Sequence, residues 1–391
     1  MCSTAAQKRM RCSKSIPIRI RRRQFPKSCG NASKPVLPVP IWQRLSGRSS
    51  KKAGIRCCVP STARRLWTAN SKPISCMTKT ASCSIPAGNS KMPLTGSLWR
   101  KNDMNALKLR IPAKINLSLD ITGKRSDGYH TLRSVFQTVG IFDTLTLTKT
   151  DENTPLSLTC DTEGIPCDAR NLVWKAAQKL LGDDPCGIAM HLEKHIPSQA
   201  GMGGGSADCA AALFGIRKLC GLNVTDAEML QIAASLGADV PFFLRGGTVL
   251  CEGIGEIMTP LAPMPARLLV MAKGEEGVST PAGYRALDAL DTPPAPHTDA
   301  VLAHLQDADA DTFFAACGND FDAVTGLAEV QTIRRIMREN GVIPILSGSG
   351  AAVFGGCSTP EQAEHLAEEL HAAGLSFTEI CRTTAEGITE I

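Results

Sequence analysis

Hydrophobic and polar residues alternate with a regular period only from about residue 107 of the 391-residue chain. The segment LKLRIPAKINLSLDI, residues 107–121, alternates with a period of two, and FDTLTLTK, residues 142–149, does the same. Between them lies GKRSDGYH, residues 123–130, which is rich in turn-forming residues. The pattern predicts β-strands over the two alternating segments and a loop over the third.

A helical period follows in two segments. In ARNLVWKAAQKLLG, residues 169–182, the apolar residues fall on one helical face and the pattern ends at a glycine. TDAEMLQIAASLG, residues 225–237, opens with Thr225 and carries Glu228 three positions on, which predicts a capping box. GIAMHLEKHIP, residues 187–197, is predicted as a strand that leads into a glycine-rich stretch. The order here is strand, glycine loop, helix.

A second group of elements begins with the predicted strand RLLVMAK, after residues 237–261, which the pattern assigns to a loop and short strands. The predicted helices cover residues 281–290, 299–306, 310–317 and 328–340, and the predicted strands cover residues 267–273, 344–349, 351–356 and 377–383. Strands and helices are interleaved in both groups, which predicts a two-layer α+β protein. We expect one domain over residues 104–262 and a C-terminal α+β domain over residues 263–391.

Residues 1–103 differ sharply in charge from the rest of the chain. They hold 22 Lys and Arg against one acid, Asp103, whereas the remainder holds 36 acids and 21 bases. Their apolar residues follow no period, so we expect a disordered basic extension. Three interpretations stay open. The segment is a translated extension upstream of a start at Met104, a plastid or mitochondrial transit peptide, or a basic arm that binds nucleic acid or an anionic surface. The first predicts a cytoplasmic protein and the second one in the plastid stroma.

The composition argues against several kinds of site. The 16 cysteines contain no C-x-x-C pair and the seven histidines form no H-E-x-x-H motif, so neither a zinc site nor a redox motif is indicated. We therefore expect a reduced, cytosolic core. An apolar run of about 18 residues, which a membrane span requires, is missing from the sequence, and we expect no membrane partner.

The glycine loop is the first candidate site. Gly201 and residues 203–205 permit positive φ and close backbone approach, so successive N–H groups can converge on one point ahead of a helix N-terminus. Such a concavity binds phosphate. A Walker A loop is excluded because no lysine follows, and Ser206 occupies the third glycine position of a dinucleotide fingerprint. A flexible hinge before a packed helix is the alternative. Asp208 is awkward for an anion site because it adds negative charge to the first helical turn.

Four segments occur in an informative order: IPAKINLSLDITGKRSDGYH, IPSQAGMGGGSADCAAAL, LGADVPFFLRGGT and ILSGSGAAVFGG. Together they resemble the motifs of the galactokinase, homoserine kinase, mevalonate kinase and phosphomevalonate kinase superfamily. The combination of PAKINL, DGYH and GADVPFF is similar, within it, to the 4-diphosphocytidyl-2-C-methyl-D-erythritol kinase family, from about residue 107 to the C-terminus. The resemblance implies an ATP-dependent kinase of non-mevalonate isoprenoid (terpenoid) precursor biosynthesis that phosphorylates the 2-hydroxyl of that substrate. It also implies a ribosomal-protein-S5-like first domain and a ferredoxin-like second domain, with the active site between them.

The resemblance further implies roles for single residues. Lys114 matches the catalytic lysine, whose ammonium suits neutralising phosphate charge, and Asp239 matches the catalytic aspartate, the candidate general base. Tyr129 and His130 match the cytidine-binding pair, since an aromatic face stacks on a base and an imidazole can donate or accept at its edge. Asn116, on the same strand face as Lys114, is assigned to substrate contact. Without the motifs, Lys114 would be interpreted as a solvated strand lysine and Asp239 as a turn residue.

The nucleotide site is implied over residues 197–207. Its members are Pro197, Ala200, Gly201, Met202, Gly203, Gly204, Gly205, Ser206 and Ala207. Backbone amides would hold the phosphates, and we expect Ser206 to reach a phosphate or the Mg²⁺ ion that accompanies ATP. No carboxylate cage is seen, so the ion is expected on phosphates and water, and no residue is assigned as a metal ligand. Ala207 replaces a serine that is common in the family, and Met202 replaces a frequent leucine.

Two other functions stay as alternatives. Another small-molecule kinase of the superfamily, acting on homoserine or mevalonate, would have no use for Tyr129 and His130. A nucleic-acid-binding protein would use the basic arm, but the acidic core has the wrong sign of charge, so we expect no nucleic-acid partner. SGSG, residues 347–350, resembles the third superfamily motif and is otherwise a simple tight turn. The sequence predicts no oligomeric state.

Overall fold

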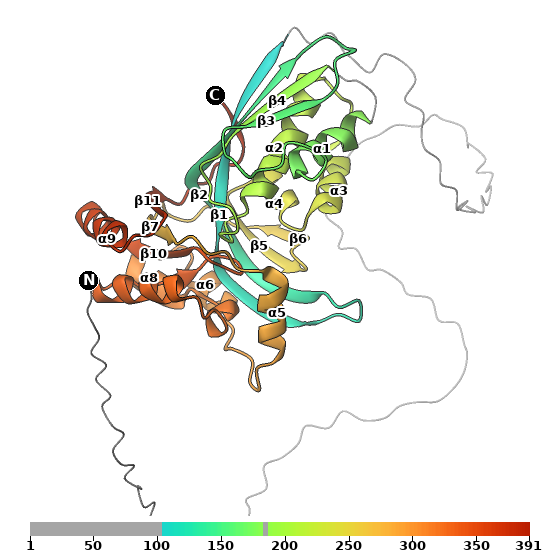
Figure 1. Cartoon of the computed structure of the whole chain (residues 1–391). Coiled ribbons are helices and arrows are strands. Elements are labelled where there is room, and N and C mark those ends of the chain that lie inside the picture. The colour runs from blue at the N-terminus through green and yellow to red at the C-terminus, as the bar shows by residue number, and fades with distance from the viewer. Residues whose placement is uncertain (1–103, 183–186) are drawn as a thin grey trace, which may run out of the picture. The chain divides into compact units, whose positions relative to one another are not determined.

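The computed structural model of this chain describes residues 104–182 and 187–391, and the predicted disordered extension, residues 1–103, lies outside them. A hairpin of two long strands, β1 (Ala106–Lys124) and β2 (His130–Lys149), runs through the molecule (Figure 1). The predicted strands are confirmed, but β2 also takes in residues 131–141, which the sequence pattern left unassigned. Residues 134–139 are all buried, so both faces of β2 are covered there and no alternation is left to detect.

The first sheet is built around this hairpin, in the order β12, β1, β2, β4, β3, with β5 and β6 continuing from β2 and β8 pairing with β1. Its other strands are β3 (Ser157–Cys160), β4 (Ile188–Glu193), β5 (Thr248–Gly253), β6 (Ile257–Pro260), β8 (Gly318–Asn319) and β12 (Thr389–Glu390). β4 ends four residues before the predicted Pro197, so the chain leaves the sheet early and enters the glycine loop from an extended segment.

Four helices belong to this half of the fold, and Figure 1 shows them on one side of the hairpin. They are α1 (Leu172–Leu181), α2 (Gly204–Leu219), α3 (Asp226–Leu236) and α4 (Val240–Arg245). The predicted capping box is confirmed, with both of its hydrogen bonds between Thr225 and Glu228 present. The loop predicted over residues 237–244 is wrong, because α4 forms there. Pro241 lies in its first turn, where proline removes no helical hydrogen bond, and residues 240–243 are buried.

The second sheet has the order β11, β7, β10, β9, and all its neighbours are antiparallel. Its strands are β7 (Leu268–Lys273), β9 (Ile345–Leu346), β10 (Val353–Cys357) and β11 (Phe377–Arg382). Numbered along the chain, the spatial order is fourth, first, third, second, with helices after the first and third strands, which is the ferredoxin-like arrangement. The predicted α+β class is therefore confirmed, and the structure builds it from two sheets.

Helices of the C-terminal half cover this sheet and connect it to the hairpin. They are α5 (Thr280–Asp288), α6 (Thr298–His304), α7 (Ala310–Ala316), the short 3₁₀ helix η1 (Asp320–Ala323), α8 (Ala328–Glu339) and α9 (Pro360–Ala372). All the α-helices of this group except α9 were predicted from the sequence. One apolar cluster includes Ile115 of β1 and Met271 of β7, so the two sheets share a core. The division at residues 262 and 263 stays a prediction.

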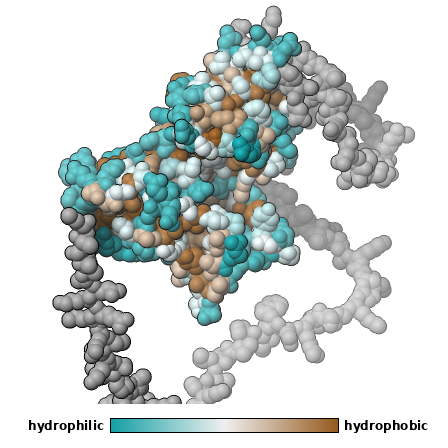
Figure 2. Space-filling view, viewed as in Figure 1, coloured by the Kyte–Doolittle hydropathy of each residue, from teal (hydrophilic) through white to brown (hydrophobic). Residues whose placement is uncertain are grey.

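The surface in Figure 2 mixes hydrophilic and hydrophobic residues over the face in view. The large apolar side chains that are exposed come from distant parts of the described sequence, among them Tyr129, Leu230, Ile257 and Ile380. In residues 104–182 and 187–391, no helix is long and apolar enough to cross a membrane.

Candidate active site

A cleft of about 930 Å³ lies where the β1–β2 hairpin, the glycine loop, the start of α4, α5 and residues 348–349 meet. Every residue predicted for the site lines this cleft except Ala207, which lies in the first turn of the helix that follows the glycine loop and is fully buried in the core. Several lining residues were not predicted, and they include Lys124, Lys194, Tyr284, Arg285 and Asp288. The fold therefore brings together segments that are far apart in the sequence.

Lys114 and Asp239 meet inside this cleft. The Nζ atom of Lys114 lies 3.7 Å from Oδ2 of Asp239 and 4.6 Å from the centre of the Phe136 ring. The Lys114 side chain is only 4% exposed, so the alternative of a solvated strand lysine is wrong. Burial lowers the pKa of Lys114, and the Asp239 carboxylate opposes that shift. Asp239 is the residue before the first turn of α4, with its side chain one-third exposed to the cleft.

Asn116 connects Lys114 to the C-terminal half of the fold. It lies two residues along β1 on the same face, and its Oδ1 accepts a hydrogen bond from Lys114 Nζ at 2.6 Å. The same oxygen accepts from the Gly348 N–H at 3.0 Å, and Nδ2 donates to Ser134 Oγ at 2.9 Å. Most of the hydrogen-bonding capacity of this amide is therefore used within the protein. One Nδ2 hydrogen is left for a ligand among the bonds that the described residues make.

Two positions of the glycine loop, Gly201 and Gly203, require glycine because of their backbone conformation and close neighbours. Gly201 has φ of 73° and Gly203 has φ of 72°, both in the left-handed region. A Cβ on Gly201 would lie 1.9 Å from the carbonyl oxygen of Ser347, and one on Gly203 would lie 2.6 Å from the Phe243 ring. The loop then enters α2 at Gly204, so the N–H groups of the first helical turn open onto the cleft.

Residues 347–350 form a turn that packs directly on the glycine loop. Ser347 Oγ donates to the Gly201 carbonyl at 3.1 Å. The backbone N–H groups of the next residues, Ala351 and Ala352, donate to the carbonyls of Gln199 and Ala200 at 3.2 and 3.1 Å. The turn therefore does more than join two strands, because it holds the phosphate-loop candidate against the second sheet.

Asp208 belongs to a buried cluster with Lys194 and Asp143 and does not point into the anion site. Lys194 Nζ donates to Asp208 Oδ2 at 2.8 Å and to Asp143, and the three side chains are at most 8% exposed. Burial raises the pKa of Asp208 to about 8, with the Asp143 carboxylate adding to the shift and the Lys194 ammonium opposing it. Burial lowers the pKa of Lys194, but the two carboxylates outweigh it and the net shift is upward. Asp208 thus faces Lys194 and does not line the cleft.

The ammonium of Lys194 also lies against the start of α2. A Cβ on Gly204 would lie 3.2 Å from its Nζ atom. Lys194 was not predicted as a site residue because it follows an ordinary strand and belongs to no motif. The signal that could have revealed it is the combination of a lysine just before the glycine loop with an aspartate in the first turn of the following helix.

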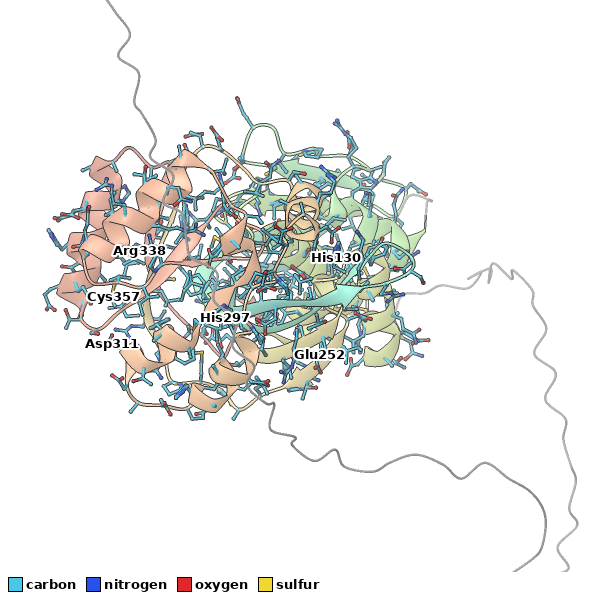
Figure 3. The ribbon with its side chains drawn as sticks, turned by 90° about the horizontal axis from the view of Figure 1, so that it is seen from below. His130, Glu252, His297, Asp311, Arg338 and Cys357 are labelled. Carbon is cyan, nitrogen blue, oxygen red and sulfur yellow. The ribbon has the colours of Figure 1, made fainter. Side chains whose placement is uncertain are left out.

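The far end of the cleft is formed by the tip of the hairpin and by α5. Tyr129 is 62% exposed at this tip, and His130 begins β2, where Figure 3 labels it. The His130 ring stacks on Tyr284 of α5, with ring centroids 4.5 Å apart and planes 12° apart. His130 Nε2 lies 2.7 Å from Asp288 Oδ1, and Lys124 Nζ lies 2.5 Å from Asp288 Oδ2. A tyrosine and an aspartate four residues apart on a predicted helix was the signal available in the sequence.

Known proteins are similar to this chain in both sequence and fold. Residues 171–247 match the family described as GHMP kinases N terminal domain. The chain is 39% identical over 253 residues to the 4-diphosphocytidyl-2-C-methyl-D-erythritol kinase of Caldicellulosiruptor saccharolyticus. The aligned region covers 63% of this chain and 87% of that protein. The chain is 37% identical over 287 residues to the enzyme of that name from Caldicellulosiruptor bescii, covering 72% of this chain and 99% of that protein.

A solved structure gives the same result. The crystal structure of a 4-(cytidine 5'-diphospho)-2C-methyl-D-erythritol kinase superposes with a TM-score of 0.58 at 30% identity, and covers 72% of this chain and 100% of that one. The match therefore spans the whole of the solved enzyme. With this coverage and identity, the chain belongs to the 4-diphosphocytidyl-2-C-methyl-D-erythritol kinase family, within the GHMP kinases.

Proposed function

We propose that this chain transfers the γ-phosphoryl group of ATP to the 2-hydroxyl of 4-diphosphocytidyl-2-C-methyl-D-erythritol, a step of non-mevalonate isoprenoid precursor biosynthesis. The observation that carries the proposal is the Lys114–Asp239 pair, 3.7 Å apart, within one cleft that runs from the glycine loop to His130. Phosphoryl transfer needs an anion site, a cation beside the transferred group and a proton acceptor beside the attacking oxygen. Those three elements lie along this cleft.

The phosphate end of the reaction is assigned to residues 197–206. Converging N–H groups and the N-terminus of α2 attract the phosphate chain of ATP. Lys114 supplies positive charge beside them. Because Lys114 is buried, little solvent screens its attraction to a phosphate, and that attraction is stronger than it would be in water. Asn116 and Asp239 hold the ammonium between them, so Lys114 acts from a fixed position.

The acceptor end is assigned to Asp239. Its carboxylate is the candidate that takes the hydroxyl proton as the oxygen attacks the γ-phosphorus. A carboxylate is a weak base for an alcohol, so most of the rate is supplied by alignment of the reacting oxygens and by charge stabilisation.

Mg²⁺ fits this site as a companion of the nucleotide. In residues 104–182 and 187–391, no group of three or more His, Cys, Asp or Glu side chains could hold a metal ion. Mg²⁺ suits such a site because it keeps several waters and binds through substrate phosphates with one or two protein oxygens. The Ser206 hydroxyl and the Asp239 carboxylate are among the oxygens that line the cleft. When bound, the ion neutralises phosphate charge.

The substrate end is assigned to the hairpin tip. Tyr129 offers an aromatic face to a pyrimidine, and the His130 imidazole, which stacks on Tyr284, offers a polar edge. Homoserine and mevalonate carry no base and would leave these groups without a partner. The nucleotide-binding and catalytic part then corresponds to residues 104–262, and residues 263–391 contribute α5 and the turn at Ser347.

The test is ADP release by the full-length chain with Mg-ATP and the diphosphocytidyl substrate, with homoserine and mevalonate as rivals. Lys114→Met is expected to lower kcat about 10²- to 10³-fold, and Asp239→Asn about 10²- to 10⁴-fold. Lys179→Met, which replaces an exposed lysine of α1 outside the cleft, is the matched control and keeps the parent rate. Equal turnover of homoserine or mevalonate would overturn the substrate assignment. Full activity in either cleft variant would overturn the roles given to the pair.

A further inference from the structure

We propose that Asp288 sets the preference for cytosine over uracil, by fixing the ring orientation and the tautomer of His130. The inference rests on the proposed function, in which His130 contacts the base of the substrate. It adds Asp288 of α5, which lines the cleft and contacts the His130 imidazole, as a positioning residue that acts through His130.

Two residues of α5 hold the His130 ring from different directions. Tyr284 stacks on one face of the imidazole, with planes 12° apart and centroids 4.5 Å apart. Asp288, one helical turn on, lies on the same side of α5 and meets the ring edge, with Oδ1 at 2.7 Å from Nε2. The stacked ring fixes the plane of the imidazole, and the carboxylate fixes its rotation within that plane. The side chain of His130 is 9% exposed, so little space is left for another rotamer.

The Asp288 carboxylate is itself held at both oxygens. Oδ2 accepts from Lys124 Nζ at 2.5 Å while Oδ1 faces His130. The hydrogen bond from Lys124, together with that from His130, holds the pKa of Asp288 below its ordinary range. The carboxylate is therefore ionised near neutral pH. An ionised carboxylate is acceptor-only, so the proton of this contact belongs to Nε2 of His130.

This assignment decides what His130 offers to a ligand. An imidazole that has a single ring proton and donates it from Nε2 to Asp288 carries a lone pair on Nδ1. Nδ1 has no hydrogen-bond partner among the bonds given for residues 104–182 and 187–391, so it is available to a ligand. His130 then presents an acceptor.

An acceptor at this point distinguishes the two pyrimidines. Cytosine carries an amino group at C4, which donates, whereas uracil carries a carbonyl oxygen there, which accepts. Nδ1 of His130 can accept a hydrogen bond from the cytosine amino group. Against uracil, its lone pair would face a lone pair of the carbonyl oxygen, and the two would repel each other. Without Asp288 the imidazole can turn over or take the other tautomer and donate to uracil. A site built around a fixed polar partner rejects the wrong ligand more strongly than one that can adapt.

The experiment uses the full-length chain and compares kcat/KM for the diphosphocytidyl substrate with that for its uridine counterpart. Asp288→Ala is expected to lower the cytidine-to-uridine ratio about tenfold, since one aligned hydrogen bond is lost for cytosine and one repulsion is removed for uracil. The change should lie in KM, with kcat for the cytidine substrate nearly kept, because Lys114 and Asp239 are untouched. Asp299→Ala is the matched control, since Asp299 is ion-paired with Arg133 of β2 but does not line the cleft. It keeps the parent ratio.

A second readout reports the tautomer itself. The sample is ¹⁵N-histidine-labelled protein in mildly alkaline solution, and the His130 resonances are assigned by their loss in His130→Gln. We expect these resonances to show a protonated Nε2 and an unprotonated Nδ1. Asp288→Ala is expected to shift them toward a mixture of the two tautomers. An unchanged spectrum together with an unchanged substrate ratio overturns the proposal.

The outcome for His130→Ala separates this inference from the function on which it rests. If His130→Ala keeps the preference for cytosine, the proposed role of His130 at the base is wrong and the role of Asp288 falls with it. If His130→Ala loses the preference while Asp288→Ala retains both the ratio and the tautomer, only the inference about Asp288 is overturned. Loss of preference in both variants, with a changed tautomer in Asp288→Ala, supports the proposal.

Discussion

Replacing Gly201 by alanine tests whether the glycine loop and the turn at Ser347 are held in backbone contact. The new Cβ would lie 1.9 Å from the Ser347 carbonyl oxygen and 2.7 Å from its carbonyl carbon. Real Cβ atoms essentially never come closer than 3.0 Å to such atoms, so one of the two segments must move by about 1 Å. The obstacle is backbone, which cannot rotate away as a flexible side chain could. The substitution therefore strains both segments.

Two contributions set the magnitude. An alanine at φ of 73° is in the left-handed region and costs about 1–2 kcal/mol. Forcing extra volume into a packed contact costs about 1–3 kcal/mol more. We expect Gly201→Ala to lower the free energy of unfolding by about 2–5 kcal/mol, measured by urea denaturation followed by circular dichroism. The displaced loop should also raise KM for ATP, because its N–H groups no longer converge on the phosphates.

The neighbouring glycine Gly205 supplies the control. It is the second residue of α2, it does not have positive φ, and a Cβ there meets nothing within 4 Å. Gly205→Ala should leave stability unchanged or raise it by up to about 1 kcal/mol, because alanine favours the helix. If Gly201→Ala unfolds within about 0.5 kcal/mol of the parent, or no earlier than Gly205→Ala, the contact with Ser347 does not constrain the loop and the reasoning fails.

Three further substitutions test other parts of the structure. Asn319→Ala removes a buried amide that donates at 2.8 Å to the carbonyls of Leu346 and Gly348, on either side of Ser347. We expect the free energy of unfolding to fall by about 1–3 kcal/mol and kcat to fall as well. An unchanged kcat would show that the turn keeps its place without the amide. The pKa of Asp208 is raised by burial from 3.8 to about 8, so the folded state binds more protons than the unfolded state in that window and loses stability as pH rises through it. Asp208→Asn should flatten this slope in urea titrations between about pH 4 and pH 8, and parallel slopes for parent and variant would refute it. Thr225→Ala breaks the capping box with Glu228 and should cost about 1 kcal/mol in the same assay without changing KM; a cost near zero would mean that water replaces the cap.

Local periodicity predicted most elements correctly, and its failures have physical causes. The hairpin strands, α1, α3 with its capping box, and the strands of the second sheet were all expected from period and turn residues. Residues 131–141 of β2 gave no alternation because the sheet is covered on both faces there. α4 was predicted as a loop because Pro241 suggests an extended chain, whereas proline is also accepted in the first turn of a helix.

The candidate site was predicted by motif, but its electrostatics were not. Lys114 was identified from the sequence, yet its burial and its position between Asn116 and Asp239 depend on strands and a helix from distant segments. Asp208 was expected to disturb an anion site, and the fold directs it to Lys194 instead. Ala207 was expected among the nucleotide contacts, but its side chain is on the buried face of α2 and packs in the core.

By itself the sequence determined the order of strand, glycine loop and helix, the helix caps, and the residue types available for phosphate chemistry. These follow from periodicity and from backbone conformations that act over a few residues. Only the tertiary structure decided which groups face one another: the turn at Ser347 against Gly201, Lys194 against Asp208, and α5 against His130. Such contacts arise when two sheets close on a shared core, and no short-range pattern encodes the distance between residues that the fold alone brings together.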